Sequence, residues 1–313
     1  MRARREIILS AGAFNTPQLL MLSGIGPKQE LEKHGLTTRI DLPGVGKNLQ
    51  DRYEVGIVHR MDQEFELLKH ADFKESDKEF REWRAGSGLY ATNGAVIAVI
   101  KRSSESKLEP DLFLFAVPGY FAGYHPGYSS DHIHEKHWFT WVLLKAHTNN
   151  TAGEVLLRSG NPRDTPSVNF HYFDEGNDPH GDDLDSVVAG IDFVRRITAR
   201  SASLCMEVIP GPQVQSRAAL GQFVKDNAWG HHACGTCKIG AADDKSAVLD
   251  SRFRVKGTTG LRVVDASVFP KIPGFFIVSA IYMIAEKASD LILDDAGKIA
   301  PADKRSEPKR AHG

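Results

Sequence analysis

The spacing of hydrophobic residues changes several times along the chain, and each change predicts a different element. At the start, residues 6–10 form a short β-prone run, EIILS, that we predict to be a strand. A helix is predicted over residues 18–22, because Thr16 can cap it and Pro17 is tolerated at a first helical position. Turn residues dominate from residue 42 to residue 51, after which the pattern changes.

Past a domain boundary that we place near residue 55, the hydrophobic runs become short and are separated by Gly, Pro and Asn. We predict strands over residues 96–100, 111–117, 138–144, 154–158 and 167–171. Because no regular helices separate these strands, they favour a largely antiparallel sheet. The expected fold is therefore α/β to α+β, with helices flanking the sheet.

Helices are predicted where hydrophobic residues recur at helical spacing or where good helix formers follow a cap. They cover residues 76–84, 182–199, 216–226 and 277–293, and a strand over residues 261–264 precedes the last helix. The final stretch, residues 294–313, has almost no large apolar residues, so we expect it to be disordered.

Composition excludes several classes of protein. The 313 residues are 41% hydrophobic and 25% charged, with a formal net charge of −1, as in an ordinary globular domain without a nucleic-acid or anionic-membrane partner. The longest apolar run, residues 275–285, is shorter than the roughly 20 residues that span a bilayer, so no transmembrane segment is expected. Three cysteines make no disulfide framework, which favours a reducing compartment, and we expect the cytoplasm.

The candidate chemistry lies in residues 229–240, WGHHACGTCKIG. His232 sits among glycines and small residues, close in sequence to a strand that ends in Asp265, so its imidazole can lie beside something bound at that strand end. A lone histidine is more often a satisfied loop or core residue, and Asp265 alone is more often the cap of the next turn.

A metal site is the alternative interpretation of the same stretch. His231, His232, Cys234 and Cys237 have zinc-ligand chemistry, and the Cys-x-x-Cys spacing also occurs in thioredoxin-like redox sites. A closed zinc site usually takes ligands from two separated clusters, and the sequence has no second one. We therefore expect no metal ion, and buried cysteines that act as small hydrophobic residues.

Five segments together resemble one family, the glucose–methanol–choline (GMC) oxidoreductases, which are FAD-dependent alcohol oxidases and dehydrogenases. The segments are residues 10–26, 42–51, 232–236 (HACGT), 260–267 (GLRVVDAS) and 285–290 (AEKASD), in the family's order. Members open with a Gly-rich turn that holds the FAD pyrophosphate, and no Gly-x-Gly-x-x-Gly follows a strand at the start of this chain. The chain thus resembles the C-terminal portion of a member.

The resemblance implies a division into four parts. Residues 1–55 would be part of an FAD-binding α/β domain, and residues 56–205 an antiparallel-sheet substrate-binding domain. Residues 206–293 would complete the FAD domain and carry the catalytic histidine, and residues 294–313 would be the tail. Implied partners are a small-molecule alcohol and an N-terminal FAD-binding half.

By resemblance, His232 is the catalytic base that takes the alcohol proton while a hydride passes to the flavin. Phe276 occupies the family's second His/Asn position, eleven residues after Asp265. Phenylalanine makes no conventional hydrogen bond, so His231, Tyr282 or the unmatched middle of the chain would have to compensate. The residues implied to contact FAD are Ala11, Gly12, Asp265, Ala266 and Ile277.

Two other functions stay open at this point. The chain can be a catalytically incompetent remnant or accessory chain that lacks the FAD-binding half, or a non-redox lyase, since the family includes hydroxynitrile lyases. An aromatic loop over residues 120–128 can cover a substrate pocket, although such loops are more often surface structure. The histidines that follow it, at positions 132, 134 and 137, fit no metal-ligand spacing and are expected on a solvated loop.

Overall fold

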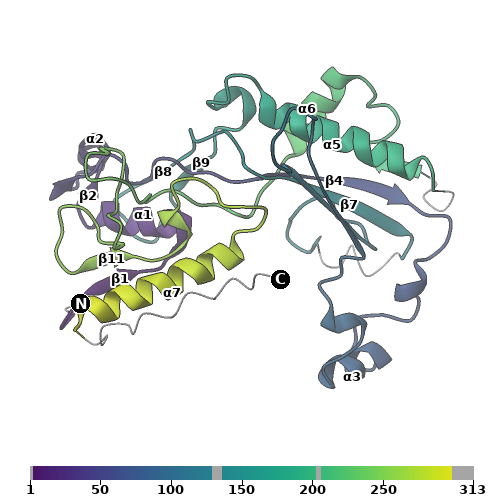
Figure 1. Ribbon diagram of the computed structural model, residues 1–313, viewed down its shortest axis with the longest axis horizontal. Helices are drawn as coiled ribbons and strands as arrows, with labels where there is room; N and C mark the ends of the chain where they lie inside the picture. The colour runs from purple at the N-terminus through teal and green to yellow at the C-terminus, as the bar shows by residue number, and fades with distance from the viewer. Residues whose placement is uncertain (1–2, 129–135, 202–205, 298–313) are drawn as a thin grey trace, which may run out of the picture.

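A computed structural model describes residues 3–128, 136–201 and 206–297, which form two lobes side by side (Figure 1). Cys205, His132, His134 and most of the predicted tail lie outside these described residues. Among the described helices, none is both long enough and apolar enough to cross a membrane.

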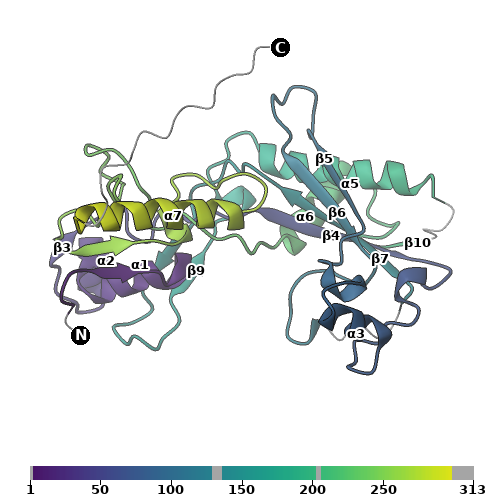
Figure 2. The same cartoon turned by 60° about the horizontal axis from the view of Figure 1, so that its bottom comes forward.

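The first lobe brings the beginning and the end of the chain together. β1 (Ile7–Leu9) pairs in parallel with β11 (Leu261–Val263), and Figure 2 shows this pair between α1 (Gly12–Leu22) and α7 (Val278–Asp295). A second parallel pair, β2 (Ile25–Gly26) with β3 (Ile40–Asp41), flanks α2 (Lys28–Lys33). Parallel strands between helices are the α/β arrangement expected for this part of the chain.

Helix α1 begins earlier than predicted, and the prediction that Thr16 caps it is wrong. It starts at Gly12, so Pro17 lies inside the helix and cannot donate the hydrogen bond that the Ala13 carbonyl would receive. The Thr236 hydroxyl donates to that carbonyl instead, at 2.7 Å. Thr16 donates its own hydroxyl to Asp265 Oδ2 at 2.6 Å. Tertiary partners thus satisfy a helix that local rules would have started later.

The second lobe is a five-stranded antiparallel sheet in the order β10-β4-β7-β6-β5. Its strands are β4 (Tyr53–Arg60), β5 (Ile97–Lys101), β6 (Leu112–Val117), β7 (Trp138–Lys145) and β10 (Met206–Ile209). Helices α5 (Asp182–Thr198) and α6 (Arg217–Asn227) cover one face and bury its alternate residues, among them Tyr53, Val55 and Ile57. The predicted antiparallel sheet with flanking helices is confirmed.

Strands β4 and β10 were not predicted, and both expected domain boundaries cut this sheet. The boundary near residue 55 falls inside β4, and the boundary after residue 205 separates β10 from β4, with which it pairs. The hairpin of β8 (Glu154–Leu156) and β9 (Ser167–Asn169) instead touches the first lobe, where Val155 N donates to Gly46 O at 2.7 Å. We therefore assign β4 and β10 to the sheet lobe and the hairpin to the first lobe.

Two short regions complete the description. Helix α7 runs to Asp295, past the predicted end at residue 293, because Asp294 and Asp295 pair with Arg252 at 2.7 and 2.6 Å. Residues 66–91 leave the sheet as η1 (Glu66–Leu68), α3 (Lys78–Arg84) and η2 (Leu89–Ala91), which border an apolar cavity of about 760 Å³. Single 3-10 turns also occur at η3 (Phe173–Glu175) and η4 (Ala266–Val268).

Candidate functional site

The site is built where the segment of residues 229–234 lies antiparallel to the start of β4. Backbone pairs close both ends, Trp229 with Glu54 and Cys234 with Gln50. Between these two pairs the histidine segment advances by five residues, from 229 to 234, whereas the facing segment advances by four, from 50 to 54. The histidine segment therefore has one extra residue, as in a β-bulge. Successive residues of a regular strand point to opposite faces, and the extra residue is what lets both histidines turn the same way.

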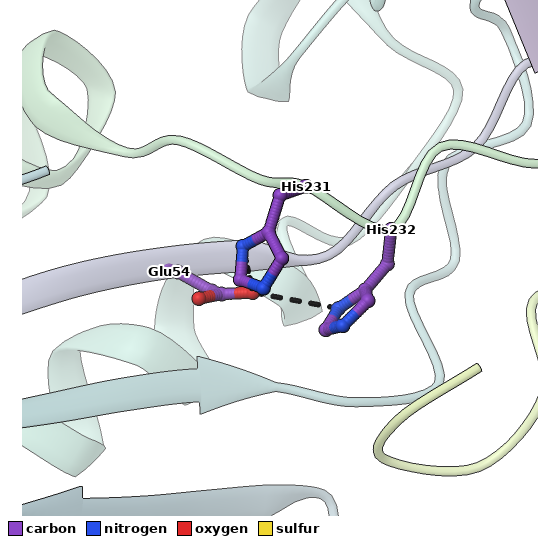
Figure 3. Close-up of side chains that lie close together, drawn as sticks. All are labelled: Glu54, His231 and His232. Atoms are coloured by element: carbon purple, nitrogen blue, oxygen red, sulfur yellow. Dashed lines mark ion pairs between the residues drawn. The ribbon is translucent and has the colours of Figure 1, made fainter. Parts of the chain in front are cut away.

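Both imidazoles approach one carboxyl group, that of Glu54 on β4 (Figure 3). Glu54 Oε1 lies 3.4 Å from His231 Nδ1 and 3.5 Å from His232 Nδ1. The side chain of Glu54 is fully buried and that of His232 is 10% exposed, whereas His231 is 42% exposed. Glu54 therefore forms the floor of the site, and His231 lies at its opening.

Asp51 and Arg52 support this floor from the same strand end. Asp51 Oδ1 accepts hydrogen bonds from the backbone N–H groups of His232 at 2.8 Å and of Arg52 at 2.7 Å. The buried Arg52 guanidinium donates to the carbonyl of Pro273, in the loop that leads into α7. Asp51 thus fixes the backbone at His232, and Arg52 ties β4 to the loop that carries Phe276.

Burial decides the charge state of the cluster. It raises the pKa of Glu54 to about 8, with a further increase from Asp51 that Arg52 opposes. Burial, His231 and Arg52 together lower the pKa of His232 to about 3, and burial raises the pKa of Asp51 to about 6. At neutral pH the contacts in Figure 3 therefore join a neutral carboxyl group to neutral imidazoles.

Several buried polar atoms of the site lack a hydrogen-bond partner among the described residues. They are both carboxyl oxygens of Glu54, Oδ2 of Asp51, Nδ1 of His232, Nε1 of Trp229, and Nε and one terminal nitrogen of Arg52. Because a buried polar group without a partner costs free energy, such atoms are normally satisfied by a bound molecule or by water. Their concentration here makes the cluster the candidate site.

Aromatic side chains form one wall of the site. Trp229 stacks on His231 with ring centroids 5.7 Å apart, and Tyr124 meets both rings edge-on at 5.3 and 5.5 Å. The loop of residues 120–128 reaches this place by crossing the sheet at Gly56, where a Cβ would lie 2.4 Å from Phe121 O. The loop predicted as a candidate cover therefore borders the site.

The Phe276 ring packs edge-on against His232, with centroids 5.6 Å apart, and against Phe113 of β6 at 5.0 Å. The expected second polar group is therefore replaced by an apolar contact. Of the residues proposed to compensate, His231 lies in the cluster, whereas Tyr282 is 71% exposed on α7. Glu54, which was not predicted, places a carboxyl oxygen 3.5 Å from His232 Nδ1.

The residues expected to contact FAD gather at the end of β11 and the start of α1. Asp265 Oδ2 accepts from Gly12 N at 3.0 Å and from the Thr16 hydroxyl, while Oδ1 accepts from Ser267 N at 2.8 Å. Gly12 has φ +83°, and a Cβ added there would meet no atom within 4 Å, so its backbone faces open space at a helix N-terminus. Ala11 beside it is exposed.

The Asp265 carboxylate already accepts from Gly12 N at this helix N-terminus, so what the edge offers a cofactor is close approach to the backbone at Gly12. Ala266 accepts from Gly235 N at 3.2 Å and so joins this edge to the histidine loop. Ile277 differs from the others because its side chain is buried with Cys234, Phe269 and Ile272. It can therefore offer only backbone atoms to a cofactor.

The residues HACGT at positions 232–236 connect the two lobes. Cys234 pairs with the strand end at Gln50, and Gly235 bonds to Ala266 after β11. Thr236 donates to Ala13 of α1 and accepts from Gly46 N at 2.9 Å. His232 is thus held at the junction between the sheet lobe and the cofactor edge, by which we mean the end of β11 and the start of α1, where contacts to FAD are expected.

The cysteines take no part in the cluster. Cys234 and Cys237 are free thiols with fully buried side chains, and burial raises the pKa of both, that of Cys234 to about 12. Low-pKa, accessible thiols are the reactive ones, so these are the small hydrophobic residues that were expected. Among the described residues, the group with ligand spacing is Glu54, His231 and His232.

Replacing Asp265 with Asn should weaken the edge between β11 and α1. An amide NH2 would face the N–H of Gly12 and the hydroxyl of Thr16, and leaving buried donors unpaired costs about 1–3 kcal/mol. We expect a free energy of unfolding lower by that amount, measured by chemical denaturation, and weaker FAD binding. Thr16→Val removes one of these bonds and should have a smaller effect; an equal effect would contradict the shared role of Asp265.

Asp51, Arg52 and Glu54 were missed because charged residues near a turn-rich segment are normally on the surface. One signal was present. Tyr53, Val55 and Ile57 alternate with the polar positions, which is the pattern of a strand with one apolar face. What the sequence could not show is that the opposite face of this strand is also covered.

Comparisons with known proteins agree with the geometry. Residues 1–54 and 149–285 match the N-terminal and C-terminal family models of GMC oxidoreductases. Oxygen-dependent choline dehydrogenase from Brucella anthropi is 37% identical over 304 residues, covering 94% of this chain and 52% of that protein. The protein of the same name from Vibrio vulnificus is 37% identical over 296 residues, covering 93% and 51%.

Among solved structures, formate oxidase from Aspergillus oryzae aligns with a TM-score of 0.78 and 25% identity, over 94% of this chain and 55% of that one. The chain spans about half the length of the curated relatives it matches.

Proposed function

Because the chain belongs to the GMC oxidoreductase family, we propose that it supplies the substrate side of an FAD-dependent enzyme that oxidises the CH–OH group of an alcohol. The observation that carries this proposal is the position of His232. It is a buried, neutral histidine, held beside Glu54 at the junction with the cofactor edge. A neutral imidazole has a ring nitrogen that can accept a proton from a hydroxyl group, and an ionised Glu54 beside it would raise the low pKa of His232.

Glu54 decides which nitrogen of His232 carries the proton. A neutral imidazole has one N–H donor and one acceptor nitrogen. When Glu54 is ionised, Nδ1–H donates to it and Nε2 is free to accept the alcohol proton. When Glu54 is protonated, it donates to Nδ1 and the imidazole proton stays on Nε2. The 3.5 Å separation would shorten in the substrate complex, as catalytic hydrogen bonds often do.

FAD is the cofactor that we propose for this site, and when bound it supplies the hydride acceptor. Ala11, Gly12 and Ala266 would offer backbone atoms to it, and Asp265 holds these segments together. Exposed apolar side chains on β1, α1 and α7, including Ile8, Phe14 and Met283, support the proposal that an FAD-binding half packs against this lobe.

The substrate that we propose is a cationic alcohol of the choline type. The curated relatives are choline dehydrogenases, and the site combines a buried carboxyl group, Glu54, with an aromatic wall of Trp229, Tyr124 and Phe121. Aromatic faces next to a carboxylate recognise quaternary ammonium groups. A bound cation would also favour the ionised form of Glu54, and so the active tautomer of His232.

The pH dependence of turnover tests the role of Glu54. We expect kcat/KM to rise with pH through about 8, the pKa of Glu54, because only its carboxylate leaves Nε2 of His232 free. Asp51 raises this pKa further and Arg52 lowers it. Glu54→Gln should abolish the rise and increase KM for choline more than KM for dimethylbutanol, its neutral isostere. An unchanged pH profile in Glu54→Gln would overturn this role.

Flavin content tests the proposal as a whole. The purified chain is denatured after its visible spectrum is recorded, and released FAD is measured. Stoichiometric FAD that choline bleaches supports an oxidoreductase. A folded, colourless chain that takes up no added FAD supports the remnant or accessory chain, and cyanohydrin cleavage without flavin reduction supports the lyase.

A further inference from the structure

We propose that His231, His232 and Glu54 form a binding site for a divalent transition-metal ion such as Zn²⁺, with Nδ1 of each imidazole and Oε1 of the carboxylate as ligands. Two histidines and one glutamate are a common ligand set of open zinc sites, in which water or another molecule takes the fourth position. The existence of this site does not depend on the proposed oxidoreductase function.

The spacing of the ligand atoms carries the inference. In a tetrahedral site with metal–nitrogen and metal–oxygen bonds of about 2.0–2.1 Å, neighbouring ligand atoms lie about 3.3–3.4 Å apart. Glu54 Oε1 lies 3.4 Å from Nδ1 of His231 and 3.5 Å from Nδ1 of His232, and all three atoms lie within 4.8 Å of one another. The three atoms can therefore surround one ion after small rotations of the side chains.

The second observation concerns the hydrogen bonding of these atoms. Both oxygens of the fully buried Glu54 and Nδ1 of His232 lack hydrogen-bond partners among the described residues. A metal ion would satisfy them at once, and Glu54 would release its proton on binding. The partly exposed ring of His231 gives the ion a way in.

Charges of both signs surround the site. Asp51, whose Oδ1 binds the backbone of His232, adds a second carboxyl group near the ligands, while the Arg52 guanidinium opposes a further positive charge. The Arg52 guanidinium donates a hydrogen bond to Pro273 O, and it acts on all three ligands. His231 is the most exposed of the three ligands. Replacing it therefore tests the affinity for the metal ion without disturbing the buried side chains of Glu54 and His232.

A metal on this site would inhibit alcohol oxidation, and this consequence rests on the proposed function. A metal on Nδ1 of His232 leaves the imidazole proton on Nε2, which is the nitrogen proposed to accept the alcohol proton. Zn²⁺ would then act as a reversible inhibitor that also competes with a cationic alcohol for Glu54.

The test is a titration of the purified chain with Co²⁺, which absorbs strongly in the visible range when tetrahedral, followed by displacement with Zn²⁺. We expect one ion per chain. His231→Phe keeps a ring against Trp229 but removes a ligand, so we expect binding at least about tenfold weaker. His34→Gln is the matched control, since His34 pairs with Glu30 at 3.3 Å without a second histidine nearby, and it should not change binding.

Absence of tetrahedral Co²⁺ bands, or equal affinity in His231→Phe and the unmodified chain, would overturn the metal site. The activity assay separates the two proposals. If Co²⁺ binds as expected but Zn²⁺ leaves the rate of alcohol oxidation by the FAD-loaded protein unchanged, the metal site stands and the assignment of His232 as the base is wrong.

Discussion

Replacing His232 with Ala should lower kcat for alcohol oxidation by about 10²–10⁴-fold while leaving the flavin content unchanged. This imidazole is buried, stays neutral across the neutral pH range and lies at the lobe junction. Its backbone N–H bond to Asp51 does not involve the side chain, so the loop should keep its position in the variant. Steady-state rates with choline and the ratio of FAD to protein are the measurements.

Two controls separate chemistry from structure in this experiment. His34→Ala removes a histidine that pairs with Glu30 far along the sequence from the cluster, and it should keep full activity. Added imidazole should restore part of the rate to His232→Ala, because it can enter the space left by the side chain. Undiminished turnover in His232→Ala would rule out the assignment.

Replacing Gly235 with Ala should lower the free energy of unfolding by about 2–5 kcal/mol, the largest stability effect that we predict. Gly235 has φ +94°, a left-handed conformation that costs an L-residue about 1–2 kcal/mol. A Cβ there would lie 2.4 Å from the backbone oxygen of Asn48, so the chain itself must move. The shift would also disturb the bond from Gly235 N to Ala266 O, and with it the cofactor edge.

Gly35→Ala is the matched control, because Gly35 has φ +69° but no atom within 4 Å of the added carbon. It should cost only the conformational penalty of about 1–2 kcal/mol. Urea denaturation of both variants measures the difference. Equal losses would show that the close approach of Asn48 to Gly235 has no energetic consequence.

The sequence was informative where a motif concentrates several physical constraints in a few residues. His232, Gly235 and Thr236 belong to one five-residue motif, in which Gly235 bonds to Ala266 after β11, Thr236 bonds to Ala13 of α1, and His232 lies beside Glu54. The roles of these residues in catalysis and FAD binding stay predictions. The antiparallel sheet and the helices α5 and α6 also followed from hydrophobic spacing.

The rest depended on long-range contacts that local patterns do not encode. Glu54 meets the histidines across about 180 residues of chain, and the alternation at the start of β4 predicts one exposed face, whereas both faces of this strand are buried. Helix α1 starts early although Pro17 cannot donate a hydrogen bond to the Ala13 carbonyl. The Thr236 hydroxyl donates to that carbonyl instead. In each case the partner that overrides the local rule comes from the other end of the sequence.

The most direct test of the central claim is the anaerobic mixing of the FAD-loaded chain with choline, in which the visible absorbance of the oxidised flavin is followed. We predict that the absorbance falls in the unmodified protein and that the fall is at least about a hundredfold slower in His232→Ala. If the bound flavin stays oxidised with choline and with dimethylbutanol, or if His232→Ala is reduced at the same rate, the proposed alcohol oxidation at His232 is contradicted.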